Sequence, residues 1–133
     1  MRYQYDLNNV TANDLQGFFE GWENPPSTQK HYEILKNSSQ IILAYENDKL
    51  IGFITAITDN VISAYIPLLE ILPEYKNQGI GSELLHRMLE QLNDVYMIDI
   101  VCDEQLAGFY EKQGFSKLTG MAKRNRGKQS CES

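Results

Sequence analysis

Cysteine and long apolar runs are both scarce in this sequence. The 133 residues include two cysteines, Cys102 inside an apolar run and Cys131 near the end of the chain. A buried strand residue and a loose tail seldom meet in the fixed geometry of a disulfide, so we expect reduced thiols, with Cys102 as a small core side chain. No apolar run approaches the roughly 20 residues that cross a bilayer, and the opening MRYQYDLNNV has no apolar signal core. We therefore expect a cytoplasmic protein with no membrane partner.

Positive charge is scarce over most of the chain. Residues 1–122 carry 8 basic and 17 acidic side chains, a net charge of −9, whereas residues 123–133 carry four basic and one acidic, a net charge of +3. The acidic body argues against a nucleic-acid partner and mildly favours cationic small molecules. The length predicts a single domain, residues 1–122, followed by a basic and flexible tail, residues 123–133. Neither His31 nor His86 has a partner at metal-ligand spacing, so we expect no metal site.

The spacing of apolar residues predicts the order of the helices and strands. In the first part of the chain we expect a strand over 2–7, helices over 9–22 and 27–37, and two strands over 40–45 and 50–57 joined by a turn. Further on we expect a strand over 61–72 that bends at Pro67, a helix over 80–93, a strand over 95–102, a short helix around 106–110 closed by Gly114, and a last strand over 116–122. The hairpins predict antiparallel pairing, and the strand, helix and strand from 61 to 102 predict a parallel crossover. The expected fold class is therefore α+β, with a mixed, mostly antiparallel sheet flanked by helices.

The stretch YKNQGIGSELLHRM, residues 75–88, places two glycines directly before a strongly amphipathic helix. Such a pair suggests that the backbone approaches an anion, held by free N–H groups at the start of the helix. A P-loop requires Lys and then Ser or Thr after its last glycine, but Gly81 is followed by Ser82 and Glu83. A dinucleotide-binding loop requires a third glycine where this chain has Leu84, so that alternative is weak. A plain strand-to-helix turn is the remaining alternative.

Two segments carry a resemblance to a known family. One is LPEYKNQGIGSELL, and the other is FYEKQGF at Phe109 to Phe115. Together they resemble the acetyl-CoA loop and a second signature of the GNAT family, the GCN5-related N-acetyltransferases, and the order of elements from Asn9 to Phe115 is similar as well. The resemblance implies a GNAT-like fold with the parallel crossover at the acetyl-CoA site. It also implies an enzyme that transfers acetyl from acetyl-CoA, as co-substrate, to a primary amine of a small molecule or a protein by direct attack.

The resemblance assigns the acetyl-CoA contacts to residues in and around these motifs: Ile71, Leu72, Lys76, Asn77, Gln78, Gly79, Ile80, Gly81, Ser82, Asp103 and Phe109. Successive N–H groups that lead into a helix N-terminus suit a pyrophosphate without needing a basic side chain. Two positions depart from the family pattern. Lys76 replaces the usual Arg or Gln and holds a phosphate only as a point charge, while Asp103 stands where Asn is frequent and brings a negative charge near the pantetheine arm.

An amine that attacks a thioester needs a base, a polarised carbonyl and an acid for the departing thiolate. The resemblance places the acid at Tyr110, whose phenol has an ordinary pKa near 10. It places the carbonyl donor at the backbone N–H of Ile71 or Leu72, acting as an oxyanion hole does. Glu70, a carboxylate in an otherwise apolar row, is the candidate base, and burial would raise its pKa. A structural role in a bulge or an ion pair is the alternative for Glu70, and a core position is the alternative for Tyr110.

In this family the acceptor is gripped by the first two helices, which points here to Trp22, Glu23, His31, Tyr32 and Glu33. These residues identify no particular amine. The alternative to an enzyme is a non-catalytic domain that binds acyl-CoA as a sensor or an interaction module. After Ala122 only a basic, polar tail follows, so the family's usual final hairpin is absent, abbreviated or completed by a partner chain. A homodimer that supplies the missing edge is a hypothesis.

Overall fold

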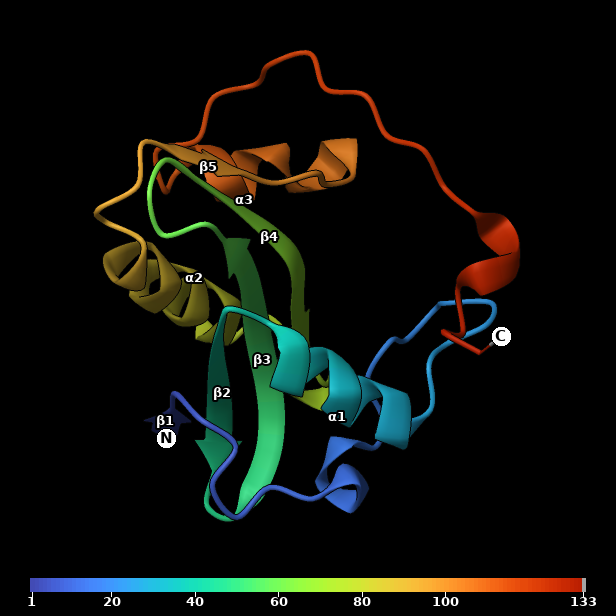
Figure 1. Ribbon diagram of the computed structural model, residues 1–133. Coiled ribbons are helices and arrows are strands. Elements are labelled where there is room, and N and C mark those ends of the chain that lie inside the picture. The colour runs from blue at the N-terminus through green and yellow to red at the C-terminus, as the bar shows by residue number, and fades with distance from the viewer. Residues whose placement is uncertain (133) are drawn as a thin grey trace.

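The computed structural model, which describes residues 1–132, has a five-stranded sheet in the order β1-β2-β3-β4-β5. The strands are β1 (Arg2–Gln4), β2 (Gln40–Glu46), β3 (Lys49–Thr58), β4 (Ser63–Ile71) and β5 (Met97–Asp99). The first four pair antiparallel, and β5 pairs parallel with β4 through Ser63, Ala64 and Tyr65. The expected mixed, mostly antiparallel sheet is therefore confirmed, as is the parallel crossover (Figure 1).

Three α-helices and four short 3-10 helices accompany the sheet. The α-helices are α1 (Thr28–Asn37), α2 (Ile80–Gln91) and α3 (Ala107–Glu111), and the 3-10 helices are η1 (Ala12–Leu15), η2 (Pro73–Tyr75), η3 (Glu104–Leu106) and η4 (Arg126–Lys128). Ser27 caps α1 by accepting a hydrogen bond from the Lys30 N–H at 3.1 Å, as its position before the helix predicts. No helix among residues 1–132 is long and apolar enough to cross a membrane.

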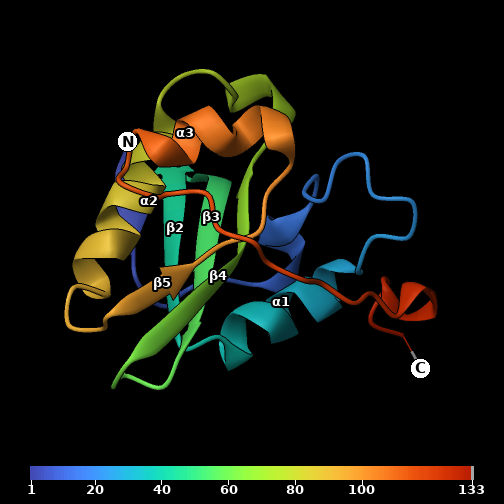
Figure 2. The ribbon, with the colours of Figure 1, turned by 90° about the horizontal axis from the view of Figure 1, so that it is seen from above.

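The sheet is covered on both faces, by α2 on one side and by η1 and α1 on the other (Figures 1 and 2). Leu84, Leu85 and Met88 of α2 are fully buried against one face of the sheet. The opposite face buries Phe53 beneath Leu15 of η1 and Leu35 of α1. Because β3 is buried on both faces, its sequence is a nearly continuous apolar run rather than an alternating one.

β4 contains a β-bulge at Pro67, and this bulge decides where the following side chains point. Thr55 pairs with Leu68 but Ile57 pairs with Tyr65, so two steps along β3 correspond to three along β4. Pro67 has no N–H to give to a ladder, so the extra residue falls where pairing would fail in any case. After the bulge, Ile71 packs on the α2 side with Ile66. Glu70, one residue earlier, is therefore on the α1 side.

β5 is shorter than the sequence predicts. The expected strand over 95–102 is formed only at Met97–Asp99, because β4 bends at the bulge and the two strands separate beyond the Tyr65 and Asp99 pair. Cys102 lies past the end of the pairing and is exposed, so its expected role as a core side chain is wrong. Both cysteines are free thiols, as expected.

Three expected elements differ from the structure. The first strand stops at Gln4 instead of Leu7. The helix expected over 9–22 is reduced to the single turn η1, because Gly17, Phe19 and Gly21 all have positive φ values, of 92, 63 and 83°, which a right-handed helix does not allow. The last strand expected over 116–122 is wrong. This segment leaves α3 and runs outside β5 without pairing with it (Figure 1).

Candidate active site

The glycine turn before α2 presents free backbone N–H groups. Asn77 and Gly79 have positive φ values, of 64 and 82°, and the helix begins at Ile80 without a side-chain cap. The first N–H groups of a helix lack intrahelical acceptors, so those of Ile80, Gly81 and Ser82 are free to bind an anion at the positive end of the helix dipole. The geometry therefore fits the pyrophosphate of acetyl-CoA.

Gly79 and Gly81 serve different purposes. Gly79 requires glycine for its backbone conformation, because its φ of 82° is strained for other residues. Gly81 has an ordinary helical φ, and a Cβ at this position would lie 3.7 Å from Cζ of Phe109 and 3.9 Å from Cγ1 of Ile71, which are normal contacts. Packing within the chain does not require a glycine at residue 81, so the glycine is better explained by the approach of a ligand.

The two motifs that the sequence singled out meet in space. The side-chain amide of Gln113, within FYEKQGF, donates to Oγ of Ser82 at 3.0 Å and to its carbonyl oxygen at 3.2 Å. These bonds fasten the segment after α3 to the first turn of α2. Phe109, Ile71 and Gly81 then converge from α3, β4 and α2. Three of the residues predicted to contact acetyl-CoA therefore line one place.

At the end of β4, Ile71 and Leu72 direct their N–H groups to opposite sides. The Leu72 N–H donates to the carbonyl oxygen of Ile51 in β3 at 2.8 Å, so it is not available to a substrate. Hydrogen-bonded and non-hydrogen-bonded pairs alternate in an antiparallel ladder, and Ile71, opposite Gly52, is of the second kind. Its N–H therefore points away from β3, toward the side from which β5 has separated. Of the two residues proposed for the carbonyl donor, Ile71 is the one with a free N–H.

Glu70 is half-buried on the α1 side of β4. Its Oε1 accepts a hydrogen bond from the backbone N–H of Phe19 at 2.9 Å. Burial raises the pKa of the Glu70 carboxyl above its ordinary value and the neighbouring Glu20 adds to this, while the Phe19 N–H and the Lys76 ammonium oppose it. Only one carboxylate oxygen is held by this bond. Glu70 is thus fixed in direction while its second oxygen is available to take a proton.

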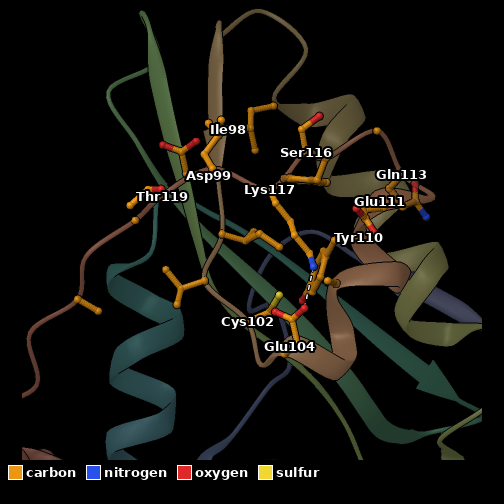
Figure 3. Close-up of a pocket in the computed structure, with 18 of the residues that line it drawn as sticks. Ile98, Asp99, Cys102, Glu104, Tyr110, Glu111, Gln113, Ser116, Lys117 and Thr119 are labelled. Atoms are coloured by element: carbon orange, nitrogen blue, oxygen red, sulfur yellow. Dashed lines mark hydrogen bonds and ion pairs between the residues drawn. The ribbon is translucent and has the colours of Figure 1, made fainter.

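Tyr110 lies on α3 between two other aromatic rings. The ring centroids are 5.0 Å from Phe109 and 5.8 Å from Phe115, both edge to face. Burial raises the pKa of the Tyr110 phenol above its ordinary value, and the nearby Cys102 thiol contributes in the same direction. Tyr110 and Cys102 line a cavity of about 820 Å³ together with Lys117 and Glu104, whose ion pair is drawn in Figure 3. The hydroxyl therefore stays protonated at neutral pH, as an acid must.

Two of the residues predicted to contact the cofactor, Lys76 and Asp103, make contacts within the chain instead. The Lys76 ammonium lies 3.7 Å from the carboxylate of Glu20 and so turns toward residues 16–22. Asp103 is exposed before η3, and its carbonyl oxygen accepts the Leu106 N–H at 2.9 Å. Asn77 and Gln78 are exposed in the turn before α2. Among residues 1–132 no cluster of His, Cys, Asp and Glu could hold a metal ion.

The predicted acceptor residues do not form one surface. Trp22, Glu23 and Glu33 are exposed and Tyr32 is half-buried, so these four are accessible. His31 is 1% exposed and packs against Phe18, Phe19 and Phe53, so a direct contact with the substrate is wrong for this residue. The helical period of α1 turns His31 inward with Leu35. Burial lowers the pKa of His31 to about 4, which keeps the ring neutral.

Sequence reasoning missed three residues that shape the site. Phe19 directs Glu70, Gln113 joins the two motifs, and Gly52 makes room for Ile71, since a Cβ at Gly52 would lie 2.7 Å from Cδ1 of Ile71. Gly17 and Gly21 flank Phe19 and gave the available signal, because glycines at a spacing of four inside an expected helix indicate a loop. No comparable signal marked Gln113.

Comparisons with known proteins agree with this geometry. The acetyltransferase (GNAT) family profile matches residues 7–115. The uncharacterized N-acetyltransferase ycf52 of Pyropia yezoensis is 34% identical over 73% of this chain and 59% of its own length, and the chloroplastic GCN5-related N-acetyltransferase 2 of Arabidopsis thaliana is 29% identical over 80% and 50%. The crystal structure of a protein from Deinococcus radiodurans R1, described as a putative acetyltransferase, superposes with a TM-score of 0.93 at 38% identity, covering 97% of this chain and 91% of that one. The chain spans about half to three fifths of the length of these two curated relatives.

Proposed function

The chain belongs to the GNAT acetyltransferase family, and we propose that it transfers the acetyl group of acetyl-CoA to a primary amine of a small molecule or a protein. The observation that carries this proposal is the convergence of Ile71, Gly81 and Phe109 beside a free N–H of β4. A mere strand-to-helix turn would need neither a glycine at residue 81 nor an unpaired N–H at Ile71.

Acetyl-CoA supplies an activated acyl group as a thioester. The N–H groups of the first turn of α2 bind its pyrophosphate, and Gly81 leaves the backbone open to it. Phe109 and the side chain of Ile71 provide apolar contact for the arm that leads to the thioester. The N–H of Ile71 donates to the thioester carbonyl, and this bond strengthens as negative charge develops on the oxygen.

Glu70 and Tyr110 handle the protons of the reaction. The amine attacks the carbonyl carbon, a C–N bond forms, and Glu70 accepts the proton that the amine loses, directly or through a water molecule. The C–S bond then breaks, and Tyr110 gives its phenolic proton to the departing sulfur. Glu70 then releases its proton to solvent, and the Tyr110 phenolate takes up a proton from solvent. No covalent link to the enzyme forms, so both substrates must be bound together.

The two substrates reach the reacting carbon from opposite faces of the sheet. Ile71 and Phe109 belong to the α2 side, where acetyl-CoA binds. The Glu70 side chain lies on the α1 side, among Phe19 and the loop of residues 16–22, so the amine approaches there. Glu20 lies close enough to Glu70 to affect its pKa, and the two carboxyl groups favour a cationic amine.

A direct experiment is the release of free CoA thiol from acetyl-CoA in the presence of a panel of amines, with the peptide amines of histone tails and small polyamines as separate arms. We expect thiol release that depends on an amine and saturates with both substrates, with intersecting initial-rate lines. Parallel lines would indicate a covalent acyl-enzyme and would contradict direct attack. Tight binding of acetyl-CoA by the wild type with no turnover across the amine panel would favour the non-catalytic sensor instead.

A further inference from the structure

One ion pair joins the turn that precedes the candidate cofactor site to the loop beside the candidate base. The Lys76 ammonium lies 3.7 Å from Oε2 of Glu20, and the two side chains are 51% and 56% exposed. Among residues 1–132 neither side chain forms a second ion pair. The pair therefore connects the acetyl-CoA side of the site with the amine side, and neither of its charges takes part in the proton transfers of the reaction.

Glu20 is held in place by the backbone around it. It lies between Phe19 and Gly21, which have positive φ values of 63 and 83°, and the Trp22 N–H closes this turn on the carbonyl oxygen of Phe19 at 3.2 Å. The Phe19 N–H is also the donor to Glu70, so the turn cannot shift without releasing the candidate base. Glu20 is therefore a carboxylate presented at a fixed place close to Glu70.

Lys76 is the partner that moves. Its backbone is fixed at the end of η2, but its side chain is long, flexible and half in solvent. Lys76 stands directly before the turn in which Asn77 and Gly79 have positive φ values, and this turn leads to the free N–H groups that begin at Ile80. An ammonium on so long a side chain can turn from Glu20 to a phosphate bound there.

We propose that the Lys76 ammonium couples the two substrate sites by changing partners. In the free enzyme it neutralises Glu20. When acetyl-CoA is bound, it turns to the phosphates, which carry more negative charge than one carboxylate, and Glu20 is left free to bind a cationic acceptor. An ion pair this exposed contributes little to stability, so the exchange costs little. The coupling rests on the acetyl-CoA site proposed for the start of α2.

The ion pair also indicates the kind of group that Glu20 binds. The Lys76 ammonium is a protonated primary amine at the end of an unbranched alkyl chain. It lies near the candidate base, because Lys76 and Glu20 both affect the pKa of the Glu70 carboxyl, which burial chiefly raises. An acceptor that carries an alkylammonium group fits the same carboxylate once Lys76 has left it.

The identity of residue 76 favours an exchange of partners. The family pattern usually has Arg or Gln at this position. An arginine would hold a carboxylate by two parallel hydrogen bonds, and a glutamine has no charge to transfer between partners. A lysine binds a carboxylate or a phosphate as a point charge, with no fixed bonding geometry to break. Lys76 is thus suited to pass from one anion to the other.

The test is the dissociation constant of CoA, which carries the same phosphates as acetyl-CoA and is not consumed, measured by titration calorimetry. Glu20→Gln should bind CoA about two- to fivefold more tightly than the wild type, because Lys76 then has no competing partner, and Lys76→Gln should bind it more weakly by a similar factor. Adding Glu20→Gln to Lys76→Gln should have no further effect. Glu74→Gln, an exposed carboxyl on η2, is the matched control and should bind CoA as the wild type does.

The probe for the acceptor side is n-butylammonium, which has the charge and the alkyl chain of a lysine side chain. In the wild type it should tighten CoA binding relative to sodium chloride at equal ionic strength, because it replaces Lys76 at Glu20 and coupling between two sites is reciprocal. Glu20→Gln and Lys76→Gln should both lose this effect. No effect on the wild type would overturn the release of Glu20 to an acceptor.

The outcomes separate this coupling from the cofactor site itself. A wild type that does not bind CoA would contradict the proposed function. CoA binding that is unchanged in both Glu20→Gln and Lys76→Gln, or weakened in both, would overturn the coupling alone, because a merely structural ion pair gives no effects of opposite sign. A Glu20→Gln effect that persists beside Lys76→Gln would overturn it too, since long-range repulsion would then be the cause. Both side chains are exposed, so we expect the variants to melt as the wild type does.

Discussion

The backbone N–H of Phe19 donates to Oε1 of Glu70 at 2.9 Å, joining two residues 51 positions apart. Phe19 holds a φ of 63°, unusual for a residue with a side chain, and its ring is buried against Trp22 and His31. The aromatic packing therefore fixes a loop whose N–H orients the candidate base. Glu70 is both a structural acceptor and a proton acceptor, so substitutions must separate the two roles.

Glu70→Gln separates them. Gln keeps a carbonyl oxygen for the Phe19 N–H but cannot act as a base, so we expect kcat to fall by about 100-fold or more, within the usual range for a general base. The melting temperature should stay level or rise, since burial disfavours the ionised carboxyl. Glu74→Gln, an exposed carboxyl on η2, is the control. Equal loss of activity and stability in Glu70→Gln would mean that the residue is structural.

The pH dependence of activity is a second test of Glu70 as the base. The carboxylate form is the active base and its pKa is raised, so activity should rise with pH through that raised pKa instead of near the ordinary value for Glu. This acidic limb of kcat/KM should disappear in Glu70→Gln. An unchanged limb in the variant would assign the titration to another group.

Tyr110→Phe tests the acid. Loss of the hydroxyl should slow transfer by roughly tenfold or more while leaving the affinity for acetyl-CoA unchanged, because the ring contacts with Phe109 and Phe115 remain. Tyr96→Phe is the matched control, since Tyr96 is 85% exposed. Steady-state turnover and calorimetric binding provide the two readouts. Full activity in Tyr110→Phe would remove Tyr110 from the mechanism and leave it as a packing residue.

Ile71→Pro tests the carbonyl donor. The Ile71 N–H makes no bond to β3, so proline at this position removes the N–H at smaller cost to the sheet than Leu72→Pro, which breaks the bond to Ile51. We expect a folded protein whose kcat is lower by about 100-fold, as in other oxyanion holes. Ile71→Ala loses side-chain packing but keeps the N–H, and it should retain most of the kcat. Equal turnover of the proline and alanine variants would contradict this role.

His31 predicts a loss of stability in acid. The ordinary pKa of histidine is 6.5 and burial lowers that of His31 to about 4, so between these values the unfolded chain binds a proton that the folded chain does not. This contribution is complete above pH 6.5 and is lost as the pH falls toward 4, by about 3 kcal/mol in total. Urea unfolding across this range should show the decline, and His31→Phe should flatten it. His86→Gln, an exposed histidine on α2, should leave it unchanged.

The sequence predicts the parts of this fold that local patterns determine. α1, α2 and the β2–β3 hairpin lie close to their expected positions, because helical spacing, the Ser27 cap and an Asn47 that tolerates a φ of 55° are local properties. The sequence also predicts the bend at Pro67, but it does not predict how the bulge turns the side chains that follow it. The choice of face for Glu70 and Ile71 depends on which β3 residues pair across the bulge, and pairing is not a local property.

Long-range contacts account for the other differences. The bond from Phe19 to Glu70 and the bond from Gln113 to Ser82 each join segments that have no common pattern in the sequence. Cys102 stands in an apolar run, yet it is exposed because β5 ends at Asp99. The burial of His31 follows from three phenylalanines that come from the loop and from β3.

The most direct test of the account is thermal melting with acetyl-CoA, CoA and NAD in parallel, on the wild type, Gly81→Ala and Gly108→Ala. An alanine fits at residue 81 within the chain and at the open residue 108, so both variants should melt near the wild type without ligand. We predict that acetyl-CoA and CoA, but not NAD, raise the melting temperature of the wild type and of Gly108→Ala by binding the folded state, and that Gly81→Ala loses this shift. No shift of the wild type at millimolar acetyl-CoA, or an equal shift in Gly81→Ala, would contradict a cofactor site at the start of α2.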